Sequence, residues 1–422
     1  MVEKQDPRYI LRRLFYAALL AADPYKATAG YLPKPPTGRT LVVGAGKAAA
    51  LMAKAVEDKW PGFVDGLVIV PYGHGPQEAN DLEHIDVIEA SHPVPDETGE
   101  MAAREILQRA RALREGDLMI SLISGGGSSL MVLPVFGIQL EGKKWINRKL
   151  LTSGATISEM NTVRRHLSAI KGGRLAAAAY PARTETIIIS DVPGDEPATV
   201  ASGPTMADPT TGADAIFILK KYEIDVPQEV FAVLEGPSGE THKPGDPLLL
   251  KSTARVTLRT RDALNAAKRE AKILGIKPFV LGDSLEGEAR ILGQEHGKLA
   301  HALSDEGLPC VILSGGETTV TKRGEGIGGR NGEYLLAMAL ELEGNRRVFA
   351  LAADTDGIDG GGANAGAVID PSTLRRAAQL DMSAWRMLED NDSFTFFDNL
   401  GDLVSTGPTR TNVNDFRAIL IV

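Results

Sequence analysis

The chain has 422 residues, a formal net charge of −9 and a single cysteine. An acidic chain without a block of Lys and Arg is a poor candidate for sequence-independent nucleic-acid binding, which needs clustered cations. One cysteine excludes an intrachain disulfide and a cysteine-based zinc site. No apolar stretch approaches the roughly 20 residues of a membrane span. We therefore expect a cytoplasmic protein without nucleic-acid or membrane partners.

Apolar runs alternate with helical patterns along the first half of the chain. The first 24 residues predict an amphipathic helix closed by a proline. Strands are expected at residues 39–44, 65–71, 84–91, 117–124 and 184–192, and helices at 47–59, 97–114 and 157–179. The strand runs are continuous and rich in Val and Ile, which is typical of strands buried on both faces. Their alternation with helices predicts a doubly wound, mainly parallel sheet of an α/β fold.

The second half predicts another α/β region. Residues 236–251 are polar and turn-rich, which indicates a linker. Strands are expected beyond it at 254–260, 277–283, 310–317, 347–354 and 416–422. The run 318–323 follows a turn directly, so we expect a hairpin within a mixed sheet. These patterns predict an N-terminal domain over residues 1–240 and a smaller α/β domain over 250–422.

A glycine loop follows the first strand. Gly44 and Gly46 permit a tight turn that exposes amides at a helix N-terminus, and Lys47 adds a cation. The spacing Gly44-x-Gly46-x-x-Ala49 also fits the dinucleotide fingerprint. The strand at 65–71 ends without the carboxylate that a NAD ribose requires, so a phosphate or carboxylate ligand is favoured. The alternative is a turn that only packs strand on helix.

A second glycine loop follows the fourth strand. Three consecutive glycines, Gly125 to Gly127, lie between Ser124 and Ser128. Such a strand end presents a nest of amides and hydroxyls, which suits a polyphosphate. The G-x-S-x-G elbow of serine hydrolases is absent. A purely structural loop is the alternative.

The run 157–179 predicts a helix with a polar face. Asn161, Arg164, Ser168 and Lys171 recur at helical spacing, and a cationic stripe on an acidic protein suits an anionic ligand. A solvated basic face is the alternative. The pair Gly172-Gly173 costs about 1 kcal/mol per glycine inside a helix, which indicates the close approach of another group.

Carboxylates follow strands in both halves. Asp191 lies at the end of the strand run 184–192, and Asp354, Asp356 and Asp359 lie at and just beyond the end of the run 347–354. Carboxylates at strand ends suit Mg²⁺, or a base that accepts a hydroxyl proton. Helix capping is the alternative for any single one.

The run 314–333 combines glycines with charged residues. Gly315, Gly316 and Glu317 follow a strand, and Arg330 and Asn331 begin a predicted helix. Arginine at that point can bind a carboxylate bidentately or neutralise a transferring phosphoryl group. The many glycines predict a mobile loop that orders on binding. Together these parts indicate metal-assisted phosphoryl transfer to a small anion.

An ordered series of motifs carries a resemblance to a known family. The motifs are GAGKAA, SHPVPD, SGGGSSL, MNTVRRHLSAIKGGRLA, SDVPGDEPATVASGPT, LSGGETTVT, GIGGRNGE, DTDGIDG and TNVND. In this order the chain resembles the type II glycerate kinases, whose C-terminal part is called the MOFRL domain. The family also carries the label hydroxypyruvate reductase.

The resemblance implies phosphorylation of D-glycerate to 2-phosphoglycerate with ATP and Mg²⁺. It implies a Rossmann-like N-terminal domain, a smaller C-terminal domain and an active site in the cleft between them. The family's proposed active-site residues correspond to Lys47 and Arg330. The chain departs from the family pattern at Gly332, where Gln is frequent, and at Gly362-Ala363, where Thr-Asp is frequent.

Residue roles follow as hypotheses. Catalytic roles go to Lys47, Arg330 and Asp191, and metal binding goes to Asp191 and Asp356. The nucleotide is assigned to Gly44, Gly46, Ser124, Gly125, Gly126, Gly127, Ser128, Gly315, Gly316, Glu317 and Asn331. The substrate is assigned to Ser91, His92, Asn161, Arg164 and Lys171. The expected partners are D-glycerate and the nucleotide, with a homodimer as one candidate assembly. An NAD(P)H-dependent hydroxypyruvate reductase and a non-catalytic nucleotide or anion sensor remain the rival functions.

Overall fold

The computed structural model describes residues 6–76 and 82–422, and the chain divides into two compact units. Unit N is Pro24–Leu258, and unit C joins Met1–Asp23 to Arg259–Val422. This division differs from the expected domains of 1–240 and 250–422, because the first helix belongs with the C-terminal half. Residues 236–251, expected to be a linker, lie inside unit N because the strand that follows them completes its sheet.

Unit N is built on a six-stranded parallel sheet with the order β3-β2-β1-β4-β5-β6. The strands are β1 (Thr40–Ala45), β2 (Val64–Pro71), β3 (Ile85–Ala90), β4 (Leu118–Ile123), β5 (Arg183–Ile189) and β6 (Ser252–Leu258). β1 and β4 are buried along their whole length, as the apolar runs predicted. The order is that of the doubly wound dinucleotide-binding folds, so the Rossmann-like expectation is confirmed.

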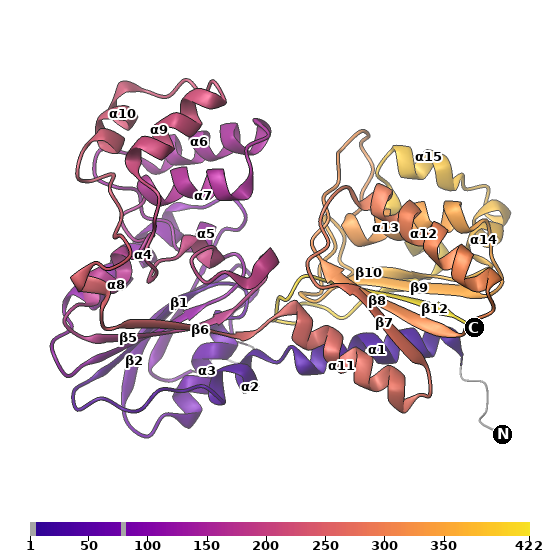
Figure 1. Ribbon diagram of the computed structural model, residues 1–422, viewed down its shortest axis with the longest axis horizontal. Helices are drawn as coiled ribbons and strands as arrows, with labels where there is room; N and C mark the ends of the chain where they lie inside the picture. The colour runs from indigo at the N-terminus through magenta and orange to yellow at the C-terminus, as the bar shows by residue number, and fades with distance from the viewer. Residues whose placement is uncertain (1–5, 77–81) are drawn as a thin grey trace. The chain divides into compact units, whose positions relative to one another are not determined.

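Helices cover both faces of this sheet (Figure 1). One face carries α3 (Ala49–Lys59), and the other carries α4 (Glu97–Arg111), α5 (Gly127–Leu130) and α8 (Arg174–Ala179). A further helical group has its own small core and consists of α6 (Leu140–Thr152), α7 (Ile157–His166), α9 (Gly212–Lys221) and α10 (Gln228–Glu235). The unit begins with α2 (Pro24–Ala29).

The continuous helix expected over residues 157–179 is wrong. α7 starts at a capping box of Thr156 and Glu159 and ends at His166. The chain then turns through Gly172 and Gly173, whose φ angles are +60° and +80°. A Cβ atom at Gly172 would lie 2.7 Å from Thr241 Cγ2. The glycine pair does mark a close approach, but the approaching group is the chain's own segment around Thr241.

Unit C contains a mixed six-stranded sheet with the order β11-β10-β9-β12-β8-β7. The strands are β7 (Lys277–Gly282), β8 (Cys310–Gly316), β9 (Val348–Asp354), β10 (Gly366–Ile369), β11 (Leu403–Val404) and β12 (Asp415–Ile421). Only the β7–β8 pairing among these is parallel. The sheet is mixed as expected, but the hairpin predicted at 318–323 is wrong. Those residues form no strand, and Thr319 makes an isolated bridge to Glu288.

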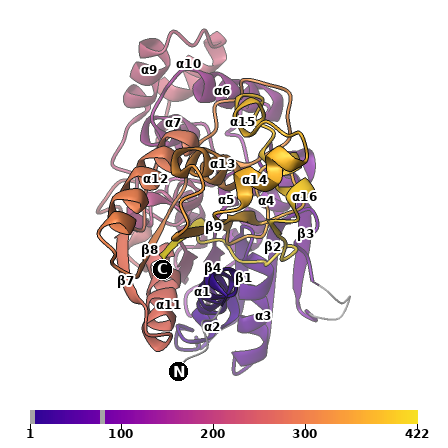
Figure 2. The same cartoon turned by 90° about the vertical axis from the view of Figure 1, so that its right-hand side faces the viewer.

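Helices also cover both faces of the unit C sheet, as the two views in Figures 1 and 2 show. One face carries α1 (Pro7–Ala21) and α11 (Thr260–Ile273). The other carries α12 (Ala289–Asp305), α13 (Arg330–Leu342), α14 (Thr373–Gln379), α15 (Ala384–Glu389) and α16 (Ser393–Leu400).

The first helix is fixed in unit C by ion pairs and apolar packing. Arg8 bonds Asp370 and Asp402, each at 2.7 Å. The ring centroids of Phe15 and Phe416 lie 5.6 Å apart. These contacts join α1 to residues at least 362 positions farther along the chain. No local sequence pattern predicts such a contact.

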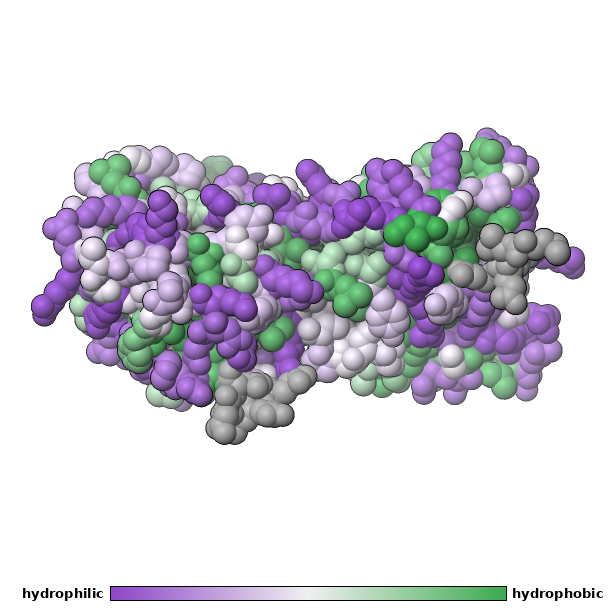
Figure 3. All heavy atoms as spheres, turned by 90° about the horizontal axis from the view of Figure 1, so that it is seen from below, coloured by the Kyte–Doolittle hydropathy of each residue, from purple (hydrophilic) through white to green (hydrophobic). Residues whose placement is uncertain are grey.

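Within the described residues, no helix is long and apolar enough to cross a membrane. The face seen from below in Figure 3 carries small apolar groups separated by hydrophilic side chains. This pattern is ordinary for a folded surface, on which single apolar residues need no special explanation.

Candidate functional site

The two glycine loops of unit N interlock at the carboxyl ends of β1 and β4. A Cβ atom at Gly44 would lie 2.3 Å from the Leu122 carbonyl oxygen, and one at Gly46 would lie 2.1 Å from Ser124 Oγ. Gly46 also has a φ of +138°. The glycines are therefore required for the two loops to touch, which is the packing alternative considered for this motif.

Two amides of the first loop already have partners in the chain. The Lys47 amide donates to the Gly125 carbonyl at 2.8 Å, and the Ala48 amide donates to Ser124 Oγ at 3.1 Å. A phosphate bound by these two amides would therefore have to replace the Gly125 carbonyl and the Ser124 hydroxyl as hydrogen-bond acceptors. The half-buried Lys47 side chain remains the group of this loop that a ligand role would use.

A chain of hydrogen bonds links three motifs that the sequence presents separately. Ser128 Oγ lies 3.0 Å from Ser202 Oγ, and Ser202 Oγ donates to Asn161 Oδ1 at 3.2 Å. Arg164 Nη1 reaches the same Asn161 oxygen at 3.5 Å. The structure thus brings the SGGGSS loop, α7 and the ASGP turn together.

The ASGP turn carries backbone strain. Ala201 and Ser202 have φ angles of +50° and +59°. Non-glycine residues in this region cost about 1–3 kcal/mol each and gather at functional sites. Ser202 was not among the predicted site residues. The position of the ASGP motif after β5 is the sequence feature that could have indicated it.

Beside these hydrogen-bonded residues lie three cations whose side-chain hydrogen bonds within residues 6–76 and 82–422 go to uncharged oxygens. Lys171 is 2% exposed and donates to the Met131 carbonyl at 2.8 Å. Lys143, equally buried, donates to the carbonyls of Leu167 at 2.7 Å and Arg164 at 3.3 Å. The side-chain contacts of Arg164 go to the amide oxygens of two asparagines. We call Lys143, Arg164 and Lys171 the cation group.

Burial lowers the pKa of every member of the cation group. Burial lowers the pKa of Lys171 to about 7, and neighbouring Arg164 adds to the effect. Burial lowers the pKa of Lys143 well below its usual range, and the nearby cations, Lys171 first, lower it further. Burial also lowers the pKa of Arg164. Lys143 was missed from the sequence because nothing in its local pattern indicates burial.

The remaining predicted residues of unit N follow β3 and β5. Ser91 and His92 are half-buried after β3, and the His92 imidazole lies 2.9 Å from the place a Cβ atom at Gly126 would take. Asp191 is half-buried after β5. The loops after β1, β3, β4 and β5 therefore supply predicted residues to the same edge of the sheet.

In unit C, Arg330 is held by three carboxylates. Its Nε donates to Asp415 Oδ1 at 2.8 Å, Nη1 to Glu317 Oε1 at 2.9 Å and Nη2 to Asp354 Oδ2 at 2.5 Å. Burial acts to lower the pKa of Arg330, but the three acids outweigh it and raise the pKa. Arg330 is thus a fully ionised and closely oriented guanidinium.

Asp415 is the buried centre of this arrangement. It is 1% exposed and also accepts from Asn331 Nδ2 at 2.8 Å and Arg417 Nη2 at 2.5 Å. As the first residue of β12, it lies beside Gly316 of β8 and Asp354 of β9. Sequence reasoning missed its role, although the TNVND motif ends on it.

The other predicted residues of unit C serve mainly local structure. A Cβ atom at Gly315 would lie 2.4 Å from Thr260 Cγ2, and one at Gly316 would lie 2.2 Å from the Leu285 amide nitrogen. Asp356 is buried, and its Oδ1 accepts the Ile358 amide at 2.9 Å. These contacts leave their assigned nucleotide and metal roles as hypotheses.

Asp359 caps helix α13. Its carboxylate accepts the amides of Asn331 at 3.0 Å and Gly332 at 2.8 Å. Burial raises the pKa of Asp359 to about 6. The N-terminus of α13, which carries Arg330, is therefore capped by a carboxylate of the chain itself. This is the capping alternative considered for the acids after the strand run 347–354.

The two departures from the family pattern pack against the start of α16. A Cβ atom at Gly332 would lie 2.5 Å from Ser393 Oγ, and one at Gly362 would lie 2.5 Å from Phe394 Cδ2. The space that larger side chains would need at Gly332 and Gly362 is filled here by the chain itself.

Comparison with known proteins places these features in a family. Residues 10–235 match a domain of unknown function (DUF4147), and residues 310–415 match the MOFRL family. The chain is 38% identical over 428 residues to a D-glycerate 2-kinase of Thermotoga maritima, and the match covers 100% of both chains. The chain belongs to the glycerate 2-kinase family. The family resemblance drawn from the motifs is confirmed.

Further relatives agree on the fold and differ in name. The crystal structure of glycerate kinase from Thermotoga maritima matches with a TM-score of 0.88 and 36% identity, covering 99% of this chain and 100% of that one. A protein of Agrobacterium vitis named "Putative hydroxypyruvate reductase" is 50% identical over 421 residues, which cover 98% of this chain and 94% of that protein.

Proposed function

We propose that this member of the glycerate 2-kinase family transfers the γ-phosphoryl group of ATP to the 2-hydroxyl of D-glycerate. The observation that carries the proposal is the cation group of unit N, which makes no ion pair with an acid within the part of the chain that the structure describes. The named glycerate kinases among its full-length relatives support the same reaction.

An anionic ligand would stabilise the charged forms of these side chains, which burial otherwise disfavours. Burying one unpaired ion costs several kcal/mol even after the protein relaxes. A ligand that brings a carboxylate or phosphate into contact with Lys171 and Arg164 recovers part of that cost. Beside these cations, Ser128, Ser202 and Asn161 offer hydroxyl and amide groups that suit a hydroxy acid.

Arg330 has a different proposed role. A guanidinium has five N–H donors, and the three acids engage one on each of its nitrogens. Because its charge is already countered, Arg330 attracts a ground-state anion weakly. We infer that its remaining donors act as fixed hydrogen-bond donors to the transferring phosphoryl group, while Lys47 binds phosphate.

The proposal includes Mg²⁺. This ion usually keeps several waters and binds one or two carboxylates together with substrate phosphates. Asp191 after β5 and Asp356 after β9 are each a carboxylate of that kind, and both are kept as candidates. Among the described residues, no group of three or more His, Cys, Asp or Glu side chains is arranged to hold a metal. We therefore propose that Mg²⁺, which would neutralise phosphate charge, arrives with the nucleotide.

Two further parts of the proposal concern the whole molecule. We infer that the enzyme works in the cytoplasm, where its nucleotide is supplied. A homodimer is the assembly to be tested, and light scattering of the purified chain distinguishes it from a monomer.

The rival activity is NAD(P)H-dependent reduction of hydroxypyruvate, which the name of the Agrobacterium relative favours. The strand that should end in a ribose-binding acid ends instead at Pro71, followed by Tyr72. The Lys47 and Ala48 amides, which a pyrophosphate would need, are bonded to the SGGGSS loop. Both observations count against a dinucleotide site.

The decisive experiment is ³¹P NMR of the products from D-glycerate, ATP and Mg²⁺. A 2-phosphoglycerate signal is expected, and it should disappear when the metal is chelated. NADH oxidation is followed in parallel with hydroxypyruvate as substrate. Reduction without phosphoglycerate would replace the kinase by the reductase, and tight ATP binding without product would indicate a sensor.

A further inference from the structure

The glycine loop that leads into Arg330 runs along the segment Asp390–Phe394. The amides of Arg323 and Gly324 both donate to Asn391 Oδ1, at 2.6 and 3.1 Å. Farther along, the Glu325 amide donates to Asp390 Oδ1 at 3.0 Å and the Ile327 amide to Asp392 Oδ1 at 3.1 Å. The Phe394 amide returns a bond to the Ile327 carbonyl at 2.9 Å. The two segments are therefore paired along their length.

Alternate residues of the loop are glycines because this pairing leaves no room for side chains. A Cβ atom at Gly324 would lie 2.1 Å from Asp390 Oδ1, one at Gly326 would lie 2.5 Å from Asp392 Cβ, and one at Gly328 would lie 2.4 Å from Ser393 Oγ. The residues between them are Glu325 and Ile327, which are exposed. This pattern explains the glycines by close packing against Asp390–Phe394, where the sequence suggested mobility.

Asn391 is the residue on which the pairing depends most. It is 6% exposed and has a φ of +56°, a conformation that asparagine tolerates better than most residues. Its Oδ1 accepts two loop amides, and its Nδ2 donates to Glu333 Oε2 at 2.8 Å and to the Thr321 carbonyl at 3.3 Å. One side chain thus holds the loop before Arg330 and the helix turn after it.

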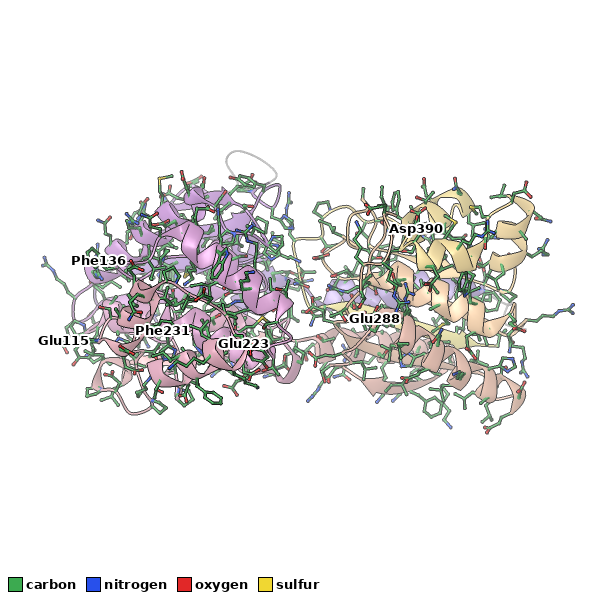
Figure 4. All side chains as sticks on the ribbon, turned by 90° about the horizontal axis from the view of Figure 1, so that it is seen from above. Glu115, Phe136, Glu223, Phe231, Glu288 and Asp390 are labelled. Carbon is green, nitrogen blue, oxygen red and sulfur yellow. The ribbon has the colours of Figure 1, made fainter. Side chains whose placement is uncertain are left out.

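The partners of Asn391 are themselves held. Glu333 pairs with Arg290 at 2.8 Å, and Arg290 also reaches Glu389 at 2.8 Å. On the other side of the loop, Glu288 accepts the amide and the hydroxyl of Thr321, both at 3.0 Å. Figure 4 labels Glu288 and Asp390 in unit C. The loop is fixed between these two acids.

We propose that the segment Asp390–Phe394, through Asn391, positions Arg330 for phosphoryl transfer. The inference rests on the proposed kinase function. Asn391 is a positioning residue, because its side chain bonds the loop amides and Glu333 and acts on Arg330 through them. A fixed donor such as Arg330 depends on its placement, and a misplacement of about 1 Å at a distance can cost 10²-fold in rate.

The test is the substitution Asn391→Asp, which keeps the acceptor oxygen and replaces the amide donor facing Glu333 by a carboxylate oxygen. Two carboxylates that share a site raise one pKa strongly, so a proton restores the bond at low pH. The other charged groups around this position are Arg290, Arg323, Glu389, Asp390 and Asp392. At pH 8 we expect kcat to fall about tenfold to hundredfold, with KM for ATP unchanged.

Recovery at low pH separates positioning from a general loss of structure. The ratio of variant to wild-type kcat should rise towards 1 as the pH is lowered to about 5.5, where a shared proton is held. The control is Asn399→Asp on α16, an exposed asparagine bonded only to Met382 Sδ among the described contacts. Its kcat ratio should stay near 1 at every pH.

A second measurement does not use catalysis. Hydrogen exchange of the peptide covering residues 321–333, corrected for pH, should be at least tenfold faster in Asn391→Asp at pH 8 than in wild type. Unchanged exchange overturns the inference, and so does faster exchange with unchanged kcat. If wild type forms no phosphoglycerate, the proposed function fails, and the catalytic part of the inference fails with it, whereas the exchange result still decides the loop contact.

A pair of glycine variants covers the case in which Asn391→Asp does not fold. Gly326→Ala should press the loop away from Asp390 and Asp392 without changing a charge, and lower kcat. Gly361→Ala is the matched control, since its added Cβ would have its nearest neighbour at 3.8 Å. Equal kcat in both variants would contradict the positioning role.

Discussion

The cation group of unit N and Arg330 of unit C differ in the groups that surround their positive charges. Lys171 is buried and Arg164 is half-buried among carbonyl and amide oxygens, and burial lowers the pKa of each. Arg330, whose side chain is 24% exposed, lies among three carboxylates, which raise its pKa. Both regions would look alike in a sequence, as cations beside glycine loops. Only the structure shows which charges lack a counter-charge.

This difference separates two kinds of help for a reaction. Cations without acids attract an anion already in the ground state, and their loss should raise KM. A neutralised but oriented arginine adds little to ground-state attraction and acts where charge moves in the transition state, so its loss should lower kcat. The two regions therefore predict opposite kinetic signatures for loss of a positive charge.

The largest effect is expected for Arg330→Ala. We expect kcat/KM to fall by about 10³-fold, in the range known for arginines that stabilise a transferring phosphoryl group, mainly through kcat. Steady-state kinetics with varied glycerate and varied ATP measure this. A loss confined to KM for glycerate would mean that Arg330 binds the substrate carboxylate and would remove the contrast between the two regions.

Arg330→Ala also leaves three acids facing one another, so stability must be followed. Removing one partner from a buried ion pair typically costs about 3–5 kcal/mol. Arg330→Lys is the matched control, because it keeps the charge near the acids and removes the fork of donors. Rates are compared only where thermal melting shows both variants folded. If Arg330→Lys matches wild type in kcat, charge and not orientation is what Arg330 supplies.

A smaller effect is expected for Lys171→Met. Loss of a hydrogen bond to a charged group corresponds to about tenfold to hundredfold in KM for the hydroxy acid, with kcat changed little. Because the pKa of Lys171 is about 7, it loses its proton as pH rises through that value. Wild-type KM should therefore rise above pH 7, while the KM of the variant should stay flat.

The stability of Lys171→Met gives an independent check. A cation whose pKa is lower in the folded state stabilises the protein progressively as pH rises from about 7 towards its unperturbed value. Measured against Lys171→Met, wild type should therefore be relatively less stable at pH 6 than at pH 9. A melting difference that does not change with pH would show that Lys171 is not buried as a lone charge.

Local patterns were sufficient for most of the fold. The Val- and Ile-rich runs placed β1 to β4 within one residue and β5 within three, because strands buried on both faces leave a continuous apolar signature. Two strands escaped: β10 has only four residues and β11 has two. The placement of α1 in unit C also escaped, since Arg8 meets Asp370 and Asp402 far along the chain.

The loops of the candidate site could be predicted from the sequence, and the surroundings of its charged side chains could not. The loops that carry Lys47, Ser128 and Arg330 were found because glycines and polar residues follow strands. Helical periodicity extended α7 too far, because spacing alone does not show where the chain turns at Gly172 and Gly173. Asp415 and Asn391 act through partners distant in sequence, which no local pattern reveals.

The last prediction concerns Asp359, a buried acid of unit C. As in the cation group, burial disfavours the charged form of its side chain. Burial raises its pKa from 3.8 to about 6, so the folded state binds its proton more tightly than the unfolded state. The stability of unit C should fall through this term as pH rises from about 4 to about 6. Asp359→Asn removes the titration, so its melting temperature relative to wild type should rise by about 4–8 °C over that window. Asp305→Asn, an exposed acid at the end of α12, is the control and should follow wild type. If the melting-temperature difference between Asp359→Asn and wild type does not change with pH, the amides of Asn331 and Gly332 offset the cost of burying the Asp359 charge. Burial would then not disfavour the charge of Asp359 as it does that of Lys171 in unit N.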